Sequence, residues 1–172
     1  MQSRTAKISL FLMIVGGAVW VGGVNIRAII GVDLLDFGTI EFKPNIHPLV
    51  EREVFRLIAL SSIVVMIAYT VTLTSSIVFL RTTSLAFKEN GWLMMSAILF
   101  YLFVPVEVYT MILDGKMVYL DFVLSSNDLV EFRKLLIHRL AALSGVPIIA
   151  LFCYYTIIAL AVFQPLKKPS SS

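Results

Sequence analysis

Long apolar runs separated by shorter polar stretches dominate this chain. The runs lie at residues 8–31, 55–79, 91–113 and 140–163. Each exceeds the roughly 20 residues that an α-helix needs to cross the hydrocarbon core of a bilayer. Their interiors carry almost no charge, whereas a surface helix of a soluble protein carries a charged face. Because only helices and closed barrels satisfy backbone amides without water, the runs predict an all-α integral membrane protein with four transmembrane helices in a four-helix bundle.

The chain also contains a partial internal repeat. Residues 55–63 and residues 138–146 are identical at five of nine positions, one of which is an arginine. A Leu-Asp-Phe sequence precedes each copy, at residues 35–37 and 120–122. Chance matches are the alternative explanation, because Leu, Ala and Ser are common in apolar helices.

Duplication predicts two helical-hairpin repeats, at about residues 6–84 and about 91–165. Both would lie in a single transmembrane domain covering residues 1–172, with a polar tail at residues 166–172. Because each repeat has two crossings, both hairpins would enter the membrane from the same side and be parallel, related by an axis along the membrane normal. A function is then expected where the two halves meet.

The second and fourth helices are expected to begin before the membrane. Pro48 suits a first helical position, and residues 125–128 (Ser-Ser-Asn-Asp) offer N-cap side chains for the fourth helix. A helix from Pro48 to the end of its apolar run would be about 50 Å long, against a hydrocarbon core of about 30 Å. Pro105 and Pro147 predict kinks in the third and fourth helices.

Composition and charge narrow the environment and the partners. The chain is 59% hydrophobic and 15% charged, and its net charge of +3 is divided between helix ends, which gives no indication of nucleic-acid binding. The single cysteine, Cys153, excludes an internal disulfide framework. Basic residues on the side of the termini are nearly unopposed by acids, which favours cytoplasmic N- and C-termini in a bacterial inner membrane.

Charged residues at one end of the predicted bundle are the candidate ligand-binding site. Arg27 and Glu107 each lie about two turns before the long-connection end of a helix. A charge facing lipid near the bilayer centre costs roughly 2–3 kcal/mol, so we expect both to face inward and to pair with each other. Arg56, His138 and Arg139 enter the second and fourth helices on the same side. Guanidinium groups there suit an anionic headgroup or a carboxylate, and the alternative is a set of structural ion pairs with snorkelling arginines.

Small residues predict where the helices pack closely. The candidates are Gly16, Ala18, Gly22, Gly23, Ser61, Ser62, Ser144 and Gly145. Small side chains let helices approach where lipid supplies no hydrophobic driving force. Trp20 lies near the middle of the first helix, so we expect it to fill the bundle interior, with stacking on a quinone or pigment as the alternative.

One helix carries a resemblance to a known family. Residues 18–23 (Ala-Val-Trp-Val-Gly-Gly) resemble the opening helix of copper-resistance-D-like and related four-helix bacterial membrane families. The resemblance covers that helix alone and implies no site residue, since residues 1–46 contain no histidine. No nucleotide-binding, nucleophile-elbow or zinc-protease motif is present, so no catalytic residue, metal site or cofactor is predicted.

Three classes of function follow from these features. We expect a non-enzymatic accessory or interaction subunit of a membrane assembly, either a homo-oligomer or bound to a partner membrane protein. The alternative is a small transporter, or a binder of anionic lipid or carboxylate, with its polar site at one mouth of the bundle. A redox or haem-bearing subunit ranks third, because His47 and His138 would not lie at matching depth.

Overall fold

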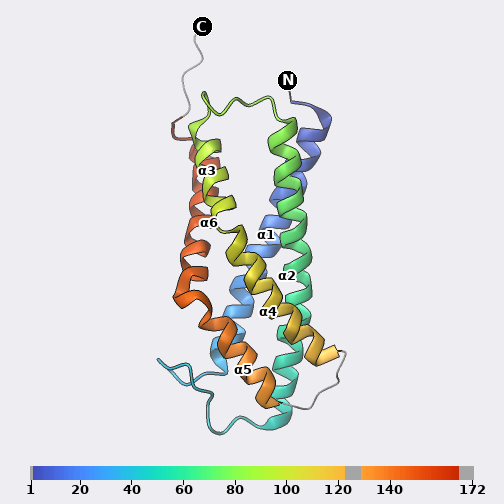
Figure 1. Ribbon diagram of the computed structural model, residues 1–172, viewed down its shortest axis with the longest axis vertical. Helices are drawn as coiled ribbons and strands as arrows, with labels where there is room; N and C mark the ends of the chain where they lie inside the picture. The colour runs from blue at the N-terminus through green and yellow to red at the C-terminus, as the bar shows by residue number, and fades with distance from the viewer. Residues whose placement is uncertain (1, 123–128, 167–172) are drawn as a thin grey trace.

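The computed structural model describes residues 2–122 and 129–166, apart from the side chains of residues 142 and 144. This part of the chain is helical (Figure 1). Its elements are α1 (Arg4–Asp33), α2 (Pro48–Thr82), α3 (Gly91–Leu102), α4 (Val104–Phe122), α5 (Leu129–Leu140), the 3₁₀ turn η1 (Ala142–Gly145) and α6 (Val146–Phe163). Four stretches are long and apolar enough to cross a membrane, namely α1, α2, α3 with α4, and α6. The prediction of four such helices is confirmed.

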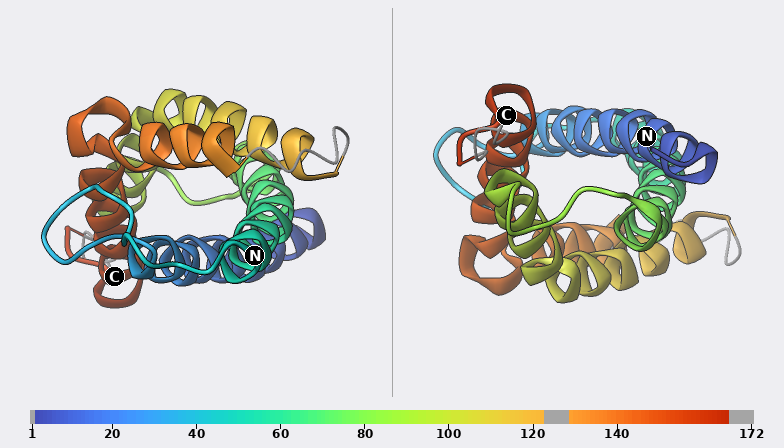
Figure 2. Two further views of the ribbon diagram at one scale, coloured as in Figure 1. Left: turned by 90° about the horizontal axis from the view of Figure 1, so that it is seen from below. Right: turned by 90° about the horizontal axis from the view of Figure 1, so that it is seen from above.

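The helices form an elongated bundle (Figure 1). Seen end-on in Figure 2, α1 and α2 lie next to each other, and α4 with α5 lies opposite α1. The most extensive packing joins α1 to α2, α6 packs along α3, and α4 packs against α2. In Figure 1, α4 runs diagonally from the α3–α6 pair toward α2. This crossing leaves α1 and α6 facing each other across the upper part of the bundle.

Two glycines of α1 explain its close packing on α2. A Cβ added at Gly16 would lie 2.7 Å from the Thr72 Oγ1 and 3.2 Å from the carbonyl oxygen of Ala68. A Cβ at Gly23 would lie 2.7 Å from the Val65 Cγ2. Gly16 and Gly23, two of the residues expected to pack closely, thus lie where α1 approaches α2.

Gly16→Ala should therefore destabilise the fold, whereas Gly22→Ala should not. Overpacking costs typically about 1–3 kcal/mol, which outweighs the gain of about 1 kcal/mol that alanine brings to a helix interior. Gly22 has no atom within 4 Å of an added Cβ, so there the helix-propensity gain stands alone. Thermal unfolding of both variants in the same detergent checks this. Equal midpoints for the two variants would contradict the close approach at Gly16.

Both predicted proline kinks are confirmed as helix breaks. α3 ends at Leu102, and α4 restarts at Val104 with Pro105 in its first turn. α6 carries Pro147 in its first turn, after Gly145 with a φ of +88°. The fourth apolar run is therefore a turn followed by a helix, and the expectation of one continuous helix into the membrane was wrong. Gly145 serves that turn rather than helix packing, since an added Cβ would meet nothing within 4 Å.

The sequence predicted the start of α2 correctly but not the end of the third span. α2 begins at Pro48, and the His47 Nδ1 accepts a hydrogen bond from the backbone N–H of Leu49. The third span does not end at residue 113, as its apolar run indicated, but continues as α4 to Phe122. The predicted N-cap at residues 125–128 lies outside the described residues.

The two copies of the sequence repeat have different local structures. Residues 55–63 lie within the uninterrupted α2, whereas residues 138–146 contain the break between α5 and α6. Residues 35–37 follow the end of α1, with a bridge between Leu35 and Phe42, whereas residues 120–122 end α4. The repeat therefore stays a prediction that local structure does not support.

Candidate functional site

A buried ionic network joins four helices near the lower end of the bundle. The Arg27 Nη1 of α1 donates to the Asp114 Oδ2 of α4 at 2.7 Å and to the Ser62 Oγ of α2 at 2.9 Å. The Arg139 Nε of α5 donates to the Asp114 Oδ1 at 3.1 Å. Asp114 is 1% exposed and Arg27 is 7% exposed. Because unpaired buried charge is costly, one carboxylate shared by two guanidinium groups ties these helices together.

Asp114 is the central residue that sequence reasoning missed. Arg27 was expected to pair with Glu107, and it pairs with Asp114 instead. The apolar run ends at residue 113, so Asp114 was placed in the following connection. A signal was available, because residues seven apart lie on one face of a helix, and Glu107 and Asp114 have that spacing.

Glu107 lies two turns further up α4 and has a different partner. The Tyr154 Oη of α6 donates to the Glu107 Oε1 at 2.9 Å. The other carboxylate oxygen has no partner within the described part of the chain. Glu107 and Arg139 both line a pocket of about 200 Å³ between α1, α4 and the start of α6, together with Thr110 and Pro147. A free carboxylate oxygen and a guanidinium group therefore face one small space.

An aromatic cluster lies directly above this pocket. The ring of Trp20 lies 4.6 Å from that of Tyr154 and 4.8 Å from that of Tyr69, centroid to centroid, and is 3% exposed. The expectation that Trp20 fills the bundle interior is confirmed. The Trp20 Nε1 and the Tyr69 Oη are buried without a hydrogen-bond partner among the described residues. Such a group costs about 1–3 kcal/mol, so this cluster can still gain energy from a polar partner.

A large apolar cavity of about 660 Å³ lies on the other side of the cluster. Its walls come from residues 13–25 of α1, 72–80 of α2, 93–101 of α3 and 154–162 of α6. Ala18 and Gly22, expected to pack against a helix, line this cavity instead.

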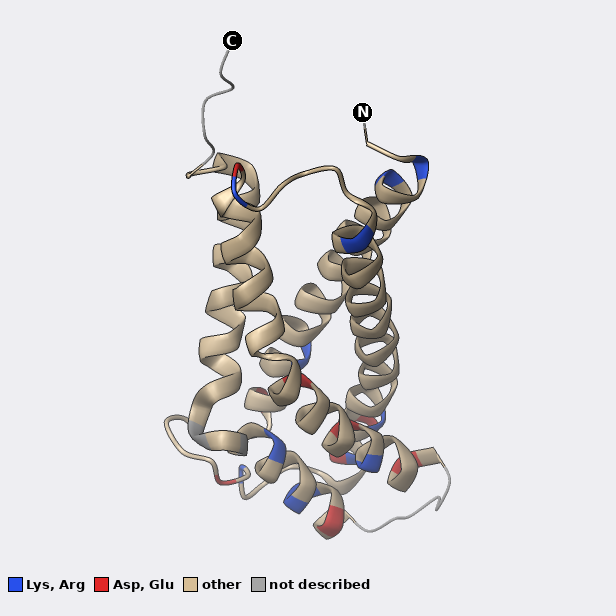
Figure 3. Ribbon diagram, turned by 45° about the horizontal axis from the view of Figure 1, so that its top comes forward, with Lys and Arg blue, Asp and Glu red and all other residues tan. Residues whose placement is uncertain are grey.

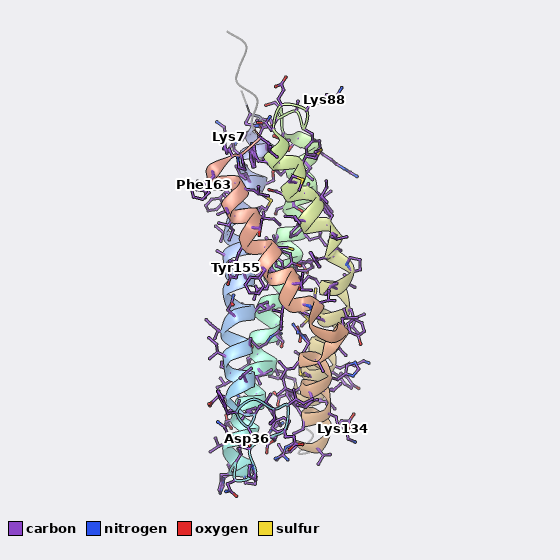
Figure 4. All side chains as sticks on the ribbon, turned by 90° about the vertical axis from the view of Figure 1, so that its left-hand side faces the viewer. Lys7, Asp36, Lys88, Lys134, Tyr155 and Phe163 are labelled. Atoms are coloured by element: carbon purple, nitrogen blue, oxygen red, sulfur yellow. The ribbon has the colours of Figure 1, made fainter. Side chains whose placement is uncertain are left out.

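Polar contacts at the edge of the large cavity are few. The Asn25 Nδ2 donates to the Tyr155 Oη at 2.8 Å across the gap between α1 and α6. Figure 4 shows this side of the molecule, with Tyr155 labelled on α6. The hydroxyls of Ser76 and Tyr101, 2.9 Å apart, pair between α2 and α3.

The cavity and the pocket meet at the aromatic cluster. Trp20, Val21 and Tyr154 line both of them. A long apolar chamber therefore lies next to a small chamber that is lined by one acidic and one basic side chain. Both lie along the side where α1 faces α6.

Two other predicted site residues lie apart from this pocket. Arg56 is exposed, because the buried face of α2 at this level runs through Phe55, Ala59 and Ser62. Its expected place beside Arg139 was wrong. The His138 Nε2 is 2.9 Å from the Tyr109 Oη in an exposed contact between α5 and α4. Of the predicted set, Arg27 and Arg139 share Asp114, and Glu107 and Arg139 line the same pocket.

The remaining predicted packing residues vary in role. Ser62 is fully buried and donates to the carbonyl oxygen of Ile58 while accepting from Arg27. Ser61 also donates to the Ile58 carbonyl and is partly buried. The side chain of Ser144 lies outside the described set.

Further ion pairs hold the lower end together. Arg133 of α5 binds Glu51 of α2 through two hydrogen bonds of 2.5 and 2.6 Å, which raise the pKa of the guanidinium. Arg133 also lies over the ring of Phe42, 5.0 Å from its centroid. Arg52 pairs with Asp121 at 2.9 Å. These contacts attach α5 and α4 to α2, and the 34–47 connection to α5.

Comparisons with protein-family models, curated protein sequences and solved structures found no match. Within the described residues, no group of three or more His, Cys, Asp or Glu side chains is placed to hold a metal ion.

Proposed function

We propose that this chain is an integral membrane protein that binds a single-chain, lipid-like amphiphile from the side of the bundle. The apolar chain of the ligand would occupy the 660 Å³ cavity, and its polar end would lie in the pocket of Glu107 and Arg139. The observation that carries the proposal is that these two chambers adjoin, because Trp20 and Tyr154 line both of them.

The size and lining of the cavity support this ligand class. Pockets for small molecules typically have volumes of about 300–1,000 Å³, with apolar walls and few polar groups. A water-soluble metabolite would leave its polar groups unpaired against these walls, at a cost of about 1–3 kcal/mol each. An acyl or prenyl chain has no such groups.

The depth of the two chambers also supports an amphiphile. Charged residues gather toward the ends of the bundle and are sparse between them (Figure 3). The large cavity follows α1 from Met13 to Asn25, about 18 Å at 1.5 Å per residue, which exceeds half of a hydrocarbon core of about 30 Å. The pocket of Glu107 continues along α1 to Val32, next to the helix end at Asp33. A ligand with its head near that end and its chain toward the bilayer centre has the orientation of a lipid in one leaflet.

Quenching of Trp20 fluorescence by brominated chains tests the proposal. In a Trp92→Phe variant, Trp20 is the sole tryptophan. Single-chain amphiphiles brominated at mid-chain are added to the full chain in detergent. Because Trp20 is buried but lines both chambers, we expect saturable quenching that the unbrominated amphiphile reverses. Quenching that rises linearly with every amphiphile, as collision with micelles would give, would refute the proposal.

An accessory role remains the second proposal, and exposed apolar side chains at the lower end favour it. Phe37 is fully exposed in the 34–47 connection, and Leu49 and Val50 are exposed in the first turn of α2. These residues could bind a partner membrane protein or a second copy of the chain. Recovery of the protein as a partner-free monomer from mild detergent would count against this role.

The predicted topology belongs to the proposal as well. We propose parallel hairpins with both termini on the cytoplasmic side of a bacterial inner membrane. In a Cys153→Ser background, a membrane-impermeant maleimide added to intact cells should label Ile40→Cys and leave Ala86→Cys unlabelled, since these exposed residues lie at opposite ends of the bundle. The reverse pattern would invert the orientation.

A further inference from the structure

The smaller chamber holds side chains of both signs, and this constrains the head of the ligand. Its lining includes Glu107 and Arg139 together with the rings of Trp20 and Tyr154. Building on the proposed function, we propose that the site selects a zwitterionic amphiphile, whose head carries an ammonium group and an anionic phosphate or carboxylate.

Glu107 supplies the place for the ammonium group. One of its oxygens accepts from Tyr154, and the other has no partner within residues 2–122 and 129–166. An ammonium there would donate to a carboxylate, and such charge-assisted hydrogen bonds are about twice as strong as neutral ones. The rings of Trp20 and Tyr154 line the same chamber, and their faces attract cations.

Arg139 supplies the place for the anionic group. Its Nε is used by Asp114, whereas its terminal nitrogens have no partner in the described part of the chain. A guanidinium presents these nitrogens in a planar fork that suits the oxygens of a phosphate or carboxylate. The hydroxyl of Thr110 lines the chamber as well.

The charge balance of the network disfavours heads of a single sign. Arg27 and Arg139 share Asp114, and Glu107 offsets the remaining positive charge, so the four groups sum to zero. A purely anionic head would lie against the Glu107 carboxylate, and a purely cationic head would lie against the Arg139 guanidinium. A neutral hydroxyl head would fit but would form no ion pair with either Glu107 or Arg139.

Competition among four heads on one chain tests the inference. The Trp92→Phe protein is titrated with brominated lysophosphatidylethanolamine, lysophosphatidylglycerol, monoacylglycerol and an alkylamine of equal chain length. We expect the lysophosphatidylethanolamine to bind about tenfold or more tightly than each of the others. Equal affinities would overturn the zwitterion inference and leave the proposed function standing. Tighter binding of the lysophosphatidylglycerol would also overturn it, in favour of an anionic head. No saturable quenching by any head would refute both proposals.

Two variants test whether Glu107 binds the ammonium group of the head and Arg139 binds its anionic group. Glu107→Gln keeps an acceptor for Tyr154 but removes the negative charge, so it should narrow the preference for lysophosphatidylethanolamine over lysophosphatidylglycerol. Arg139→Lys keeps the charge beside Asp114 but removes the fork, so it should weaken the zwitterion relative to the alkylamine. Unchanged head preferences in both variants, at unchanged thermal midpoints, would show that neither residue contacts the head.

Discussion

Replacing Asp114 with Asn should lower the stability of the protein more than any other single conservative change. The substitution keeps the shape of the side chain but leaves the guanidinium groups of Arg27 and Arg139 without their shared anion. Breaking a buried ion pair by removing one partner costs about 3–5 kcal/mol, because the remaining charge stays buried. Thermal unfolding in detergent measures the effect.

A surface pair gives the matched control for this experiment. Asp33 binds Lys43 at 3.3 Å, and its side chain is 84% exposed. Asp33→Asn should change stability by well under 1 kcal/mol, as is typical of exposed pairs. If Asp114→Asn unfolds at the same temperature as Asp33→Asn, the buried network does not hold the helices together.

Filling the large cavity should weaken binding of the proposed ligand about tenfold or more without unfolding the protein. Gly22 lines this cavity, and an added Cβ there meets no atom within 4 Å. Gly22→Phe would therefore place a ring in the space that the apolar chain of the ligand needs. We expect the affinity measured by Trp20 quenching to fall about tenfold or more, equivalent to a loss of at least about 1.4 kcal/mol.

A phenylalanine placed outside both chambers serves as the control, because it tests whether a bulky side chain alone impairs ligand binding. Gly115 of α4 also has no neighbour within 4 Å of an added Cβ, and it lines neither chamber. Gly115→Phe should bind brominated amphiphiles as the parent protein does. Unimpaired quenching in Gly22→Phe would mean that the amphiphile reaches Trp20 by another route, and the cavity would lose its assigned role.

The helices were predictable because their signals are local. The lengths of the four apolar runs predicted the four candidate membrane-spanning helices. Pro48 marked the start of α2, and Pro105 and Pro147 marked two helix breaks. Arg27 and Glu107 were found because charge inside an apolar run is costly, which indicates burial without naming a partner. Choosing Asp114 over Glu107 as the partner of Arg27 required the relative depth of α1 and α4 in the bundle, and this is a tertiary property.

The position of Arg56 and the presence of the cavity could not be predicted from the sequence, because both depend on how the helices are rotated and arranged. Arg56 was grouped with Arg139 by sequence similarity, but each residue turns a helix by about 100°, and this rotation puts Arg56 outside while Phe55 is buried. The cavity was not predicted at all. It arises because α4 crosses the bundle and keeps α6 with α3, so that small residues of α1 face open space.

The hydrogen bond between Asn25 and Tyr155 has a kinetic consequence. This hydrogen bond joins α1 to α6 near the surface and involves no charged group. Such a bond contributes on the order of 1 kcal/mol. Separating α1 from α2 would instead disrupt the tight seam at Gly16 and Gly23. Thermal motion should therefore separate α1 from α6, which are joined by this hydrogen bond and by the ring contact of Trp20 with Tyr154, before it separates α1 from α2. The proposed amphiphile would then exchange between α1 and α6 while the ionic network below stays intact.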